Sequence, residues 1–358
     1  MKSWPKIVVA PTLAAFALLC GCSGPYHLDE RWTAMGQEVH ADIYMGTERD
    51  ARAAMQDIRN AVTQVDATMN FRNPDSELTR LNREAEDAYY AVQDPDLYRV
   101  LLLAFDYAKV TEGAFDPTSG PLLRLYERGE GRLPSAAEID LALQRVGWSL
   151  VTTAPEAKAF HFRRPRMEVS LGDLPGAFAL DAGARTFSRI GAVGGLLELG
   201  SNIYVWGAPP DRPTWTVDLR DPRAPQLRLG RLQVDNRGVA ITGADPQRPG
   251  LLDARSGRPA ATDVLAAVAI ADSTADAAAM SSALFVAGSK DGADMLSKTR
   301  RLEAIMLVEG NGTRYVLASA TLQGRLELSA ELEQETGGQV RYLLPPRDLE
   351  GSGLPFGP

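Results

Sequence analysis

The spacing of apolar residues changes along the chain, and each spacing predicts a type of element. In three segments, apolar side chains recur every three or four residues, which is the period of one helix face. The first segment is Asp50–Met69, and the second runs from about Pro95 to Thr111. The third begins at Ser135 with Glu138 three residues later, a capping box, and Gly147 closes it. The stripe of the first helix consists of Met55, Ile58, Val62, Val65 and Met69.

Shorter runs of alternating or continuous apolar residues predict β-strands. Val264–Ala271 is apolar throughout, which is typical of a strand buried on both faces. Asn311-Gly312 predicts a hairpin between Ala304–Glu309 and Arg314–Ser319. Helices and strands without an internal repeat predict an α+β fold of mixed, mainly antiparallel sheets with helices outside. The other predicted strands are Glu38–Tyr44, Ala159–Arg163, Met167–Leu171, Ser201–Trp206, Trp215–Leu219 and Gly238–Thr242.

Residues 1–22 have the features of a targeting segment rather than of a folded element. Two lysines precede the apolar run Ile7–Leu19, which is too short to span a bilayer stably. The run ends in Leu19-Cys20-Gly21-Cys22, which resembles the lipobox of bacterial lipoproteins, with Cys22 as the lipidated residue. An ordinary signal peptide with two incidental cysteines is the alternative. We expect residues 23–30 to be a short tether and 320–358 to be a C-terminal extension.

Composition and charge exclude several classes of function. The 358 residues include 38 basic and 46 acidic side chains, and the net charge of −8 comes without the basic stripe of a nucleic-acid-binding protein. His27, His40 and His161 are too far apart in sequence to suggest a zinc site. The sequence contains no phosphate-binding loop, no dinucleotide fingerprint and no nucleophile elbow.

Several segments rich in Gly, Asp and Thr show neither the helical nor the strand spacing of apolar residues. Taken in their order along the chain, these segments resemble the motifs of one protein family. The first is Ala34-Met35-Gly36, and the second lies within Met69–Asn82. The most specific is Thr111-Glu112-Gly113-Ala114-Phe115-Asp116-Pro117-Thr118, and a fourth is Ser281–Gly288. On these strings the chain, from about residue 31 to 319, is identified as a member of the FAD:protein FMN transferases, the ApbE-type flavin transferases.

The resemblance implies a flavin cleft between two lobes and an enzyme that takes FAD as substrate. Such enzymes use Mg²⁺, pass FMN to a threonine of an acceptor protein and release AMP. It also implies a lipid-anchored protein of the bacterial cell envelope facing the periplasm, with a subunit of a respiratory membrane complex as a candidate acceptor. The flavin-binding residues that it implies are Met35, Arg72, Ala114, Phe115, Asp116, Ser170 and Leu252, and the metal ligands are Asp173, Ser281 and Ser282.

At several positions the chain departs from the family pattern. Ser170 stands where the family has an aspartate, Gly176 where it has a lysine, and Asn202 where it has the aspartate of a Gly-Gly-Asp motif. Gly250 replaces a histidine, and Ala278 replaces a metal-binding aspartate. The departures predict weak FAD binding with little dependence on Mg²⁺, and we assign no catalytic residue. A non-catalytic, lipid-anchored relative that binds flavin weakly, or only a protein partner, is therefore a second hypothesis.

The predicted site residues also have purely structural interpretations. Asp116 and Thr118 could cap a turn, and Asp173 could be a turn residue rather than a substitute metal ligand. Met35 could be core packing, and Arg72 could meet a phosphate or lie in solvent. These alternatives are open at the level of sequence.

Overall fold

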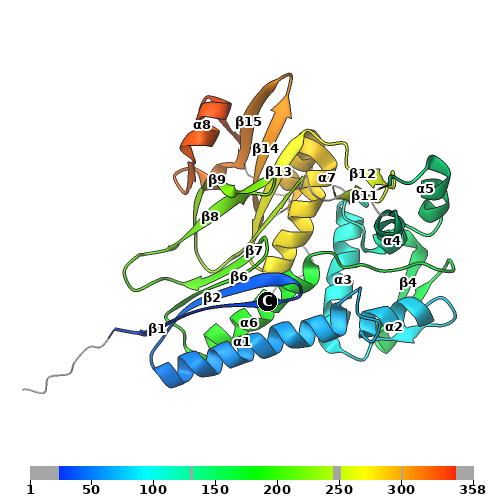
Figure 1. The fold of residues 1–358 in the computed structure, drawn as a ribbon, viewed down its shortest axis with the longest axis horizontal. Coiled ribbons are helices and arrows are strands. Elements are labelled where there is room, and N and C mark those ends of the chain that lie inside the picture. The colour runs from blue at the N-terminus through cyan, green and yellow to red at the C-terminus, as the bar shows by residue number, and fades with distance from the viewer. Residues whose placement is uncertain (1–23, 130–131, 245–250, 300, 344–358) are drawn as a thin grey trace, which may run out of the picture.

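The computed structural model describes residues 24–129, 132–244, 251–299 and 301–343. Its centre is a nine-stranded sheet in the order β1-β2-β6-β7-β10-β13-β14-β15-β17, antiparallel throughout except between β15 and β17 (Figure 1). The mixed α+β class with mainly antiparallel strands is therefore confirmed. The strands are β1 (Tyr26–Ala34), β2 (Gln37–Met45), β6 (Gly194–Leu199), β7 (Asn202–Gly207), β10 (Gly238–Gly243), β13 (Val264–Ala271), β14 (Glu303–Gly310), β15 (Thr313–Ser319) and β17 (Val340–Leu343).

Three long helices, α1 (Glu48–Met69), α6 (Leu174–Ile190) and α7 (Thr274–Lys298), lie on one face of this sheet (Figure 1). The α1 helix starts where the Thr47 side chain accepts a hydrogen bond from the Asp50 amide. Its predicted apolar stripe is buried, and Ile58 has no exposed surface. Burial of one such side chain stabilises the fold by roughly 1.5–3 kcal/mol, so packing determines where α1 lies.

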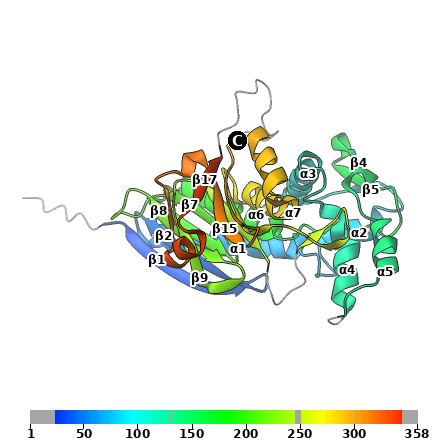
Figure 2. The same ribbon diagram turned by 90° about the horizontal axis from the view of Figure 1, so that it is seen from above.

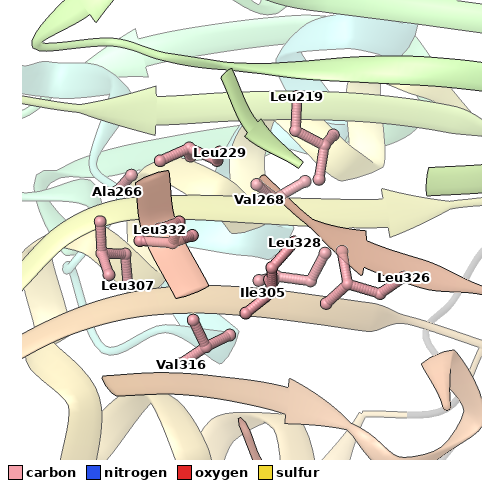
Figure 3. Close-up of a pocket in the computed structure, with 10 residues that line it drawn as sticks. All are labelled: Leu219, Leu229, Ala266, Val268, Ile305, Leu307, Val316, Leu326, Leu328 and Leu332. Carbon is pink, nitrogen blue, oxygen red and sulfur yellow. The ribbon is translucent and has the colours of Figure 1, made fainter. Parts of the chain in front are cut away.

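The opposite face of the sheet is covered by a second, smaller sheet. It consists of β16 (Leu326–Leu328), β9 (Ala224–Val234) and β8 (Trp215–Asp221), and α8 (Ala330–Thr336) packs beside it. Aliphatic side chains from both sheets and from α8 point toward one another around a small apolar cavity (Figure 3). The C-terminal residues 320–343 therefore complete a hydrophobic core.

A second lobe contains the helices between α1 and α6, as Figure 2 shows from above. It holds α2 (Glu77–Glu84), α3 (Pro95–Val110), α4 (Gly120–Arg128) and α5 (Ala136–Leu143), with a small sheet of β3 (Tyr90–Ala91), β5 (Ala159–Phe162) and β4 (Val151–Ala154). The hairpin of β11 (Leu252–Asp253) and β12 (Arg258–Pro259) lies beside it. In the described parts of the chain, no helix is both long and apolar enough to cross a membrane.

Three expectations about the elements were wrong. Strand β1 begins at Tyr26, so most of the expected tether at residues 23–30 belongs to the sheet. Met167–Leu171 is not a strand, because the Asn82 side chain, not a neighbouring strand, bonds the Val169 amide and carbonyl at 2.7 and 2.9 Å. The third helix ends at Leu143, four residues before Gly147. The signal segment and Cys22 lie outside the described residues.

Candidate functional site

The loop Thr111–Thr118, the most specific string in the sequence, makes a dense set of hydrogen bonds. The Asp116 carboxylate accepts bonds from the Thr118 amide at 2.8 Å, from the Thr118 hydroxyl at 2.7 Å and from the Trp148 amide at 3.0 Å. The Thr118 hydroxyl oxygen accepts from the Gly147 amide at 2.7 Å. Burial raises the pKa of Asp116, although these bonds oppose it. The structure therefore gives both residues a role in fixing the turn, while a flavin contact at Asp116 stays a prediction.

Ala114 and Phe115 lie in the same loop, which the β11–β12 hairpin approaches. A Cβ atom on Gly113, whose φ is +80°, would lie 3.7 Å from Arg255 Cγ and 3.8 Å from the Trp148 ring. Arg255 is held by Asp253, with Nε–Oδ1 and Nη2–Oδ2 distances of 2.8 and 3.0 Å. Leu252 precedes Asp253 in β11, so the structure brings this predicted site residue to the same region as the loop.

Three hydroxyl groups meet between β10 and α7. The Ser281 and Thr242 hydroxyl oxygens are 2.9 Å apart, and those of Ser282 and Thr242 are 3.5 Å apart. Ser281 also donates to the carbonyl of Ala278 at 3.1 Å. We call Thr242, Ser281 and Ser282 the hydroxyl cluster. The sequence does not single out Thr242, because nothing in its strand pattern separates it from an ordinary polar strand end.

The hydroxyl cluster fits Mg²⁺ poorly. Mg²⁺ sites usually include one or two carboxylates, but the neighbouring side chain of Ala278 is a methyl group that is only 4% exposed. Within the described ranges, no three or more His, Cys, Asp or Glu side chains are grouped so that they could hold a metal ion. Asp173 is exposed at the position before α6, and its carbonyl accepts a bond from the Ala177 amide. Its predicted role as a substitute ligand stays a prediction.

Two of the departures from the family pattern lie side by side. A Cβ atom on Gly176, in α6, would lie 3.2 Å from Leu199 Cδ2 and 3.9 Å from the Asn202 side-chain nitrogen. Asn202 is 4% exposed. Two uncharged residues, Gly176 and Asn202, therefore meet at this buried contact. Ser170 is also buried, and its amide donates to the Pro117 carbonyl at 2.7 Å, which links it to the loop Thr111–Thr118.

The remaining predicted flavin contacts occupy two different environments. Met35 lies in the turn between β1 and β2 with a φ of +53°, and it is partly buried against the apolar core. The side chain of Arg72 is 75% exposed and forms an ion pair with Glu127 at 2.6 Å. Arg72 thus has a protein partner in the structure, whereas Met35 packs against the main core.

Comparison with known proteins gives one consistent result. The model of the ApbE family matches residues 35–306. The chain is similar to the FAD:protein FMN transferase of Treponema pallidum, with 25% identity over 303 residues that cover 78% of this chain and 83% of the relative. It is also similar to that of Haemophilus influenzae, with 24% identity over 276 residues, 72% of this chain and 79% of the relative.

Solved structures show the same fold. The flavin transferase ApbE from Vibrio cholerae matches with a TM-score of 0.76 and 20% identity, covering 84% of this chain and 99% of that one. The ApbE protein from Thermotoga maritima matches with a TM-score of 0.74 and 23% identity, with the same coverage of both chains.

Proposed function

The chain belongs to the ApbE family, and from that premise we propose that it binds FAD and transfers FMN to a threonine of an acceptor protein. In this transfer the threonine oxygen attacks the FMN phosphorus, the bond to the AMP oxygen breaks, and AMP leaves while the threonine proton passes to a base. The observation that carries the proposal is the family match over residues 35–306, most of the chain. The named transferases from Treponema and Haemophilus support it.

We further propose that the protein is a lipoprotein anchored through Cys22 in the bacterial cell envelope, facing the periplasm. Its acceptor would then be an exposed part of a respiratory membrane complex. The lipobox-like string supports the anchor, and the family resemblance supports the acceptor. In the native host, Cys22→Ala should release the protein from membranes, whereas Cys20→Ala should leave it attached. Release by both substitutions, or by neither, would contradict the anchor.

A second candidate function has its own observation. The hydroxyl cluster next to Ala278 offers neutral oxygens where the resemblance implies a carboxylate for Mg²⁺. This favours a relative that holds FAD weakly, independently of metal, and does not transfer FMN. Calorimetry should then show weak FAD binding that EDTA hardly changes, since a metal ion would add little to it. Submicromolar binding that requires Mg²⁺ would exclude this candidate.

The decisive experiment is a transfer assay with the chain that lacks the signal segment and its lipidation site, residues 23–358, which we call the mature chain. The protein is incubated with FAD, Mg²⁺ and an acceptor domain, and the intact mass of the acceptor is measured. If the chain is a transferase, the acceptor should gain the mass of one FMN on a threonine when FAD is supplied. It should gain no mass when FMN replaces FAD. The ApbE protein of Vibrio cholerae serves as the positive control. An acceptor modified by that protein but not by this chain would overturn the transferase and leave the second candidate.

A further inference from the structure

Helices α6 and α7, which carry the altered positions Gly176 and Ala278, are joined by one carboxylate. Asp181 lies in α6, and its two oxygens accept bonds from two successive amides in the first turn of α7. The Thr274 amide donates to Oδ1 at 2.7 Å, and the Ala275 amide donates to Oδ2 at 3.0 Å. Both residues are buried, Thr274 completely. We call this bidentate contact the α6–α7 clamp. It satisfies two amides that a helix start otherwise leaves without partners.

The surroundings of the clamp disfavour its charge. Burial, with a smaller effect of the nearby Asp276, raises the pKa of Asp181 to about 6 against the opposing effect of the two amide bonds. Asp276, in the same turn of α7, accepts bonds from the Tyr107 hydroxyl of α3 and from Ser273, and burial raises its pKa as well. Tyr204 of β7 faces the same region, where burial and then Asp181 raise its pKa to about 12. Asp272, near Asp276 and Tyr204, adds to the negative field.

The clamp therefore keeps an ionised group where ionisation is unfavourable. Because the pKa of folded Asp181 lies above its ordinary value, this group stabilises the fold most when protonated, and that stability is lost as the pH rises through about 6. The two amide bonds themselves favour the ionised form, because they lower the pKa of Asp181, so protonation weakens the clamp even though it removes the cost of burying the charge. The clamp holds the start of α7 against α6.

We infer that Asp181 is a positioning residue of the candidate site: its carboxylate fixes α7, and with it Ser281 and Ser282, against α6. Ala278 lies one helical turn beyond the clamped Ala275, and Ser281 and Ser282 of the hydroxyl cluster follow within the next turn. The inference rests on the proposed function where it concerns FAD, because Asp181 acts on the ligand only through α7. Protonation removes one of the two acceptors, so FAD affinity falls as the pH drops through about 6.

The test compares Asp181→Asn with Asp276→Asn in the mature chain. Asparagine is similar in shape to aspartate, but its nitrogen cannot accept a bond, so one of the two amides loses its partner. We expect Asp181→Asn to weaken FAD binding about tenfold at pH 7.5 and to abolish the dependence on pH near 6, which is the loss expected for one charge-assisted bond. Asp276→Asn leaves the clamp in place, so its FAD affinity should still fall as the pH drops, with a midpoint below that of the wild type because the Asp276 charge helps to raise the pKa of Asp181.

A second readout needs no ligand. Hydrogen exchange of the Thr274 and Ala275 amides, normalised for the intrinsic rate, should show protection that falls below pH 6 in the wild type. In Asp181→Asn, protection should be low at every pH, while the second half of α7 stays protected. If the wild type binds no FAD at any pH, the proposed function fails and the exchange data alone decide on the clamp. Normalised exchange rates at these two amides that change neither with pH nor in Asp181→Asn would overturn the inference.

Discussion

The loop Thr111–Thr118 and the α6–α7 region both contain predicted site residues, but their side chains have different roles in the fold. In the loop, the family residues Asp116 and Thr118 satisfy backbone amides of the following turn and of Gly147 and Trp148. In the α6–α7 region, glycine, alanine and asparagine stand at positions where the family has charged residues. In these two regions, the family residues that the chain retains are the ones that make hydrogen bonds within the fold. A retained motif alone is therefore weak evidence for catalysis.

The largest effect should come from restoring one charge without its partner. Gly176→Lys places an ammonium group beside the buried Asn202, which offers no carboxylate, and we expect a loss of about 3 kcal/mol in the free energy of unfolding. Adding Asn202→Asp should recover at least half of that loss. Urea unfolding of both single variants and the double variant measures the coupling. A double variant no more stable than Gly176→Lys would show that the two positions do not form a pair.

The loop should be the next most sensitive region. Asp116→Ala leaves the amides of Thr118 and Trp148 without their acceptor, and we expect a loss of about 2 kcal/mol in unfolding free energy. Asp116→Asn, which keeps one acceptor oxygen, should lose less. If the role of Asp116 is structural, FAD affinity at a temperature where both variants are folded should stay close to that of the wild type. A large loss of affinity without a loss of stability would instead identify a flavin contact.

A smaller gain is expected from a carboxylate next to the hydroxyl cluster. Ala278→Asp adds the ligand type that Mg²⁺ prefers, on the same helix face as Ser282, and should raise Mg²⁺-dependent FAD affinity about tenfold. Calorimetry with Mg²⁺ and with EDTA separates this gain from any change without metal. Gly250→His, at a position outside the described residues, is the matched control and should change binding little, because a base serves the transfer step.

The smallest effect concerns the rim of the second lobe. The Arg132 guanidinium, followed by Ser135, lowers the pKa of the Glu138 carboxyl to about 2, and Glu138 closes the capping box of α5. Because this pKa is lowered on folding, the contribution is present above about pH 4.5 and is lost as the pH falls toward 2. Amide exchange in the first turn of α5 should therefore increase over that acid range. In Glu138→Gln it should be fast already at neutral pH.

The sequence could predict the elements that have a clear local pattern, but not those that depend on contacts between distant segments. Helix α1 and the hairpin of β14 and β15 follow from local patterns, a regular stripe and an Asn-Gly turn. The helices α6 and α7 were not predicted, because the many alanine, glycine and serine residues in them leave no clear apolar stripe. The segment at Met167–Leu171 has a strand-like pattern, yet the Asn82 side chain takes the bonds that a neighbouring strand would make.

The site shows the same limit. Resemblance singles out Ser281 and Ser282 by position, but Thr242 joins them only because β10 and α7 are adjacent in space. The pairing of Gly176 with Asn202 and the clamp at Asp181 likewise join residues far apart in the chain. Such contacts depend on tertiary packing, which neither spacing nor motif order encodes.

The order of strands in the nine-stranded sheet also has a consequence for biosynthesis. Strands β1 and β2 are synthesised first, but β2 cannot pair with β6 until the whole second lobe has been synthesised. Strand β17 is synthesised last and forms the opposite edge of the sheet. Long-range pairing of this kind makes folding slow. Nascent chains that stop before Val264 lack β13, β14, β15 and β17, so we expect proteases to degrade them, whereas chains that extend beyond Leu343 resist digestion.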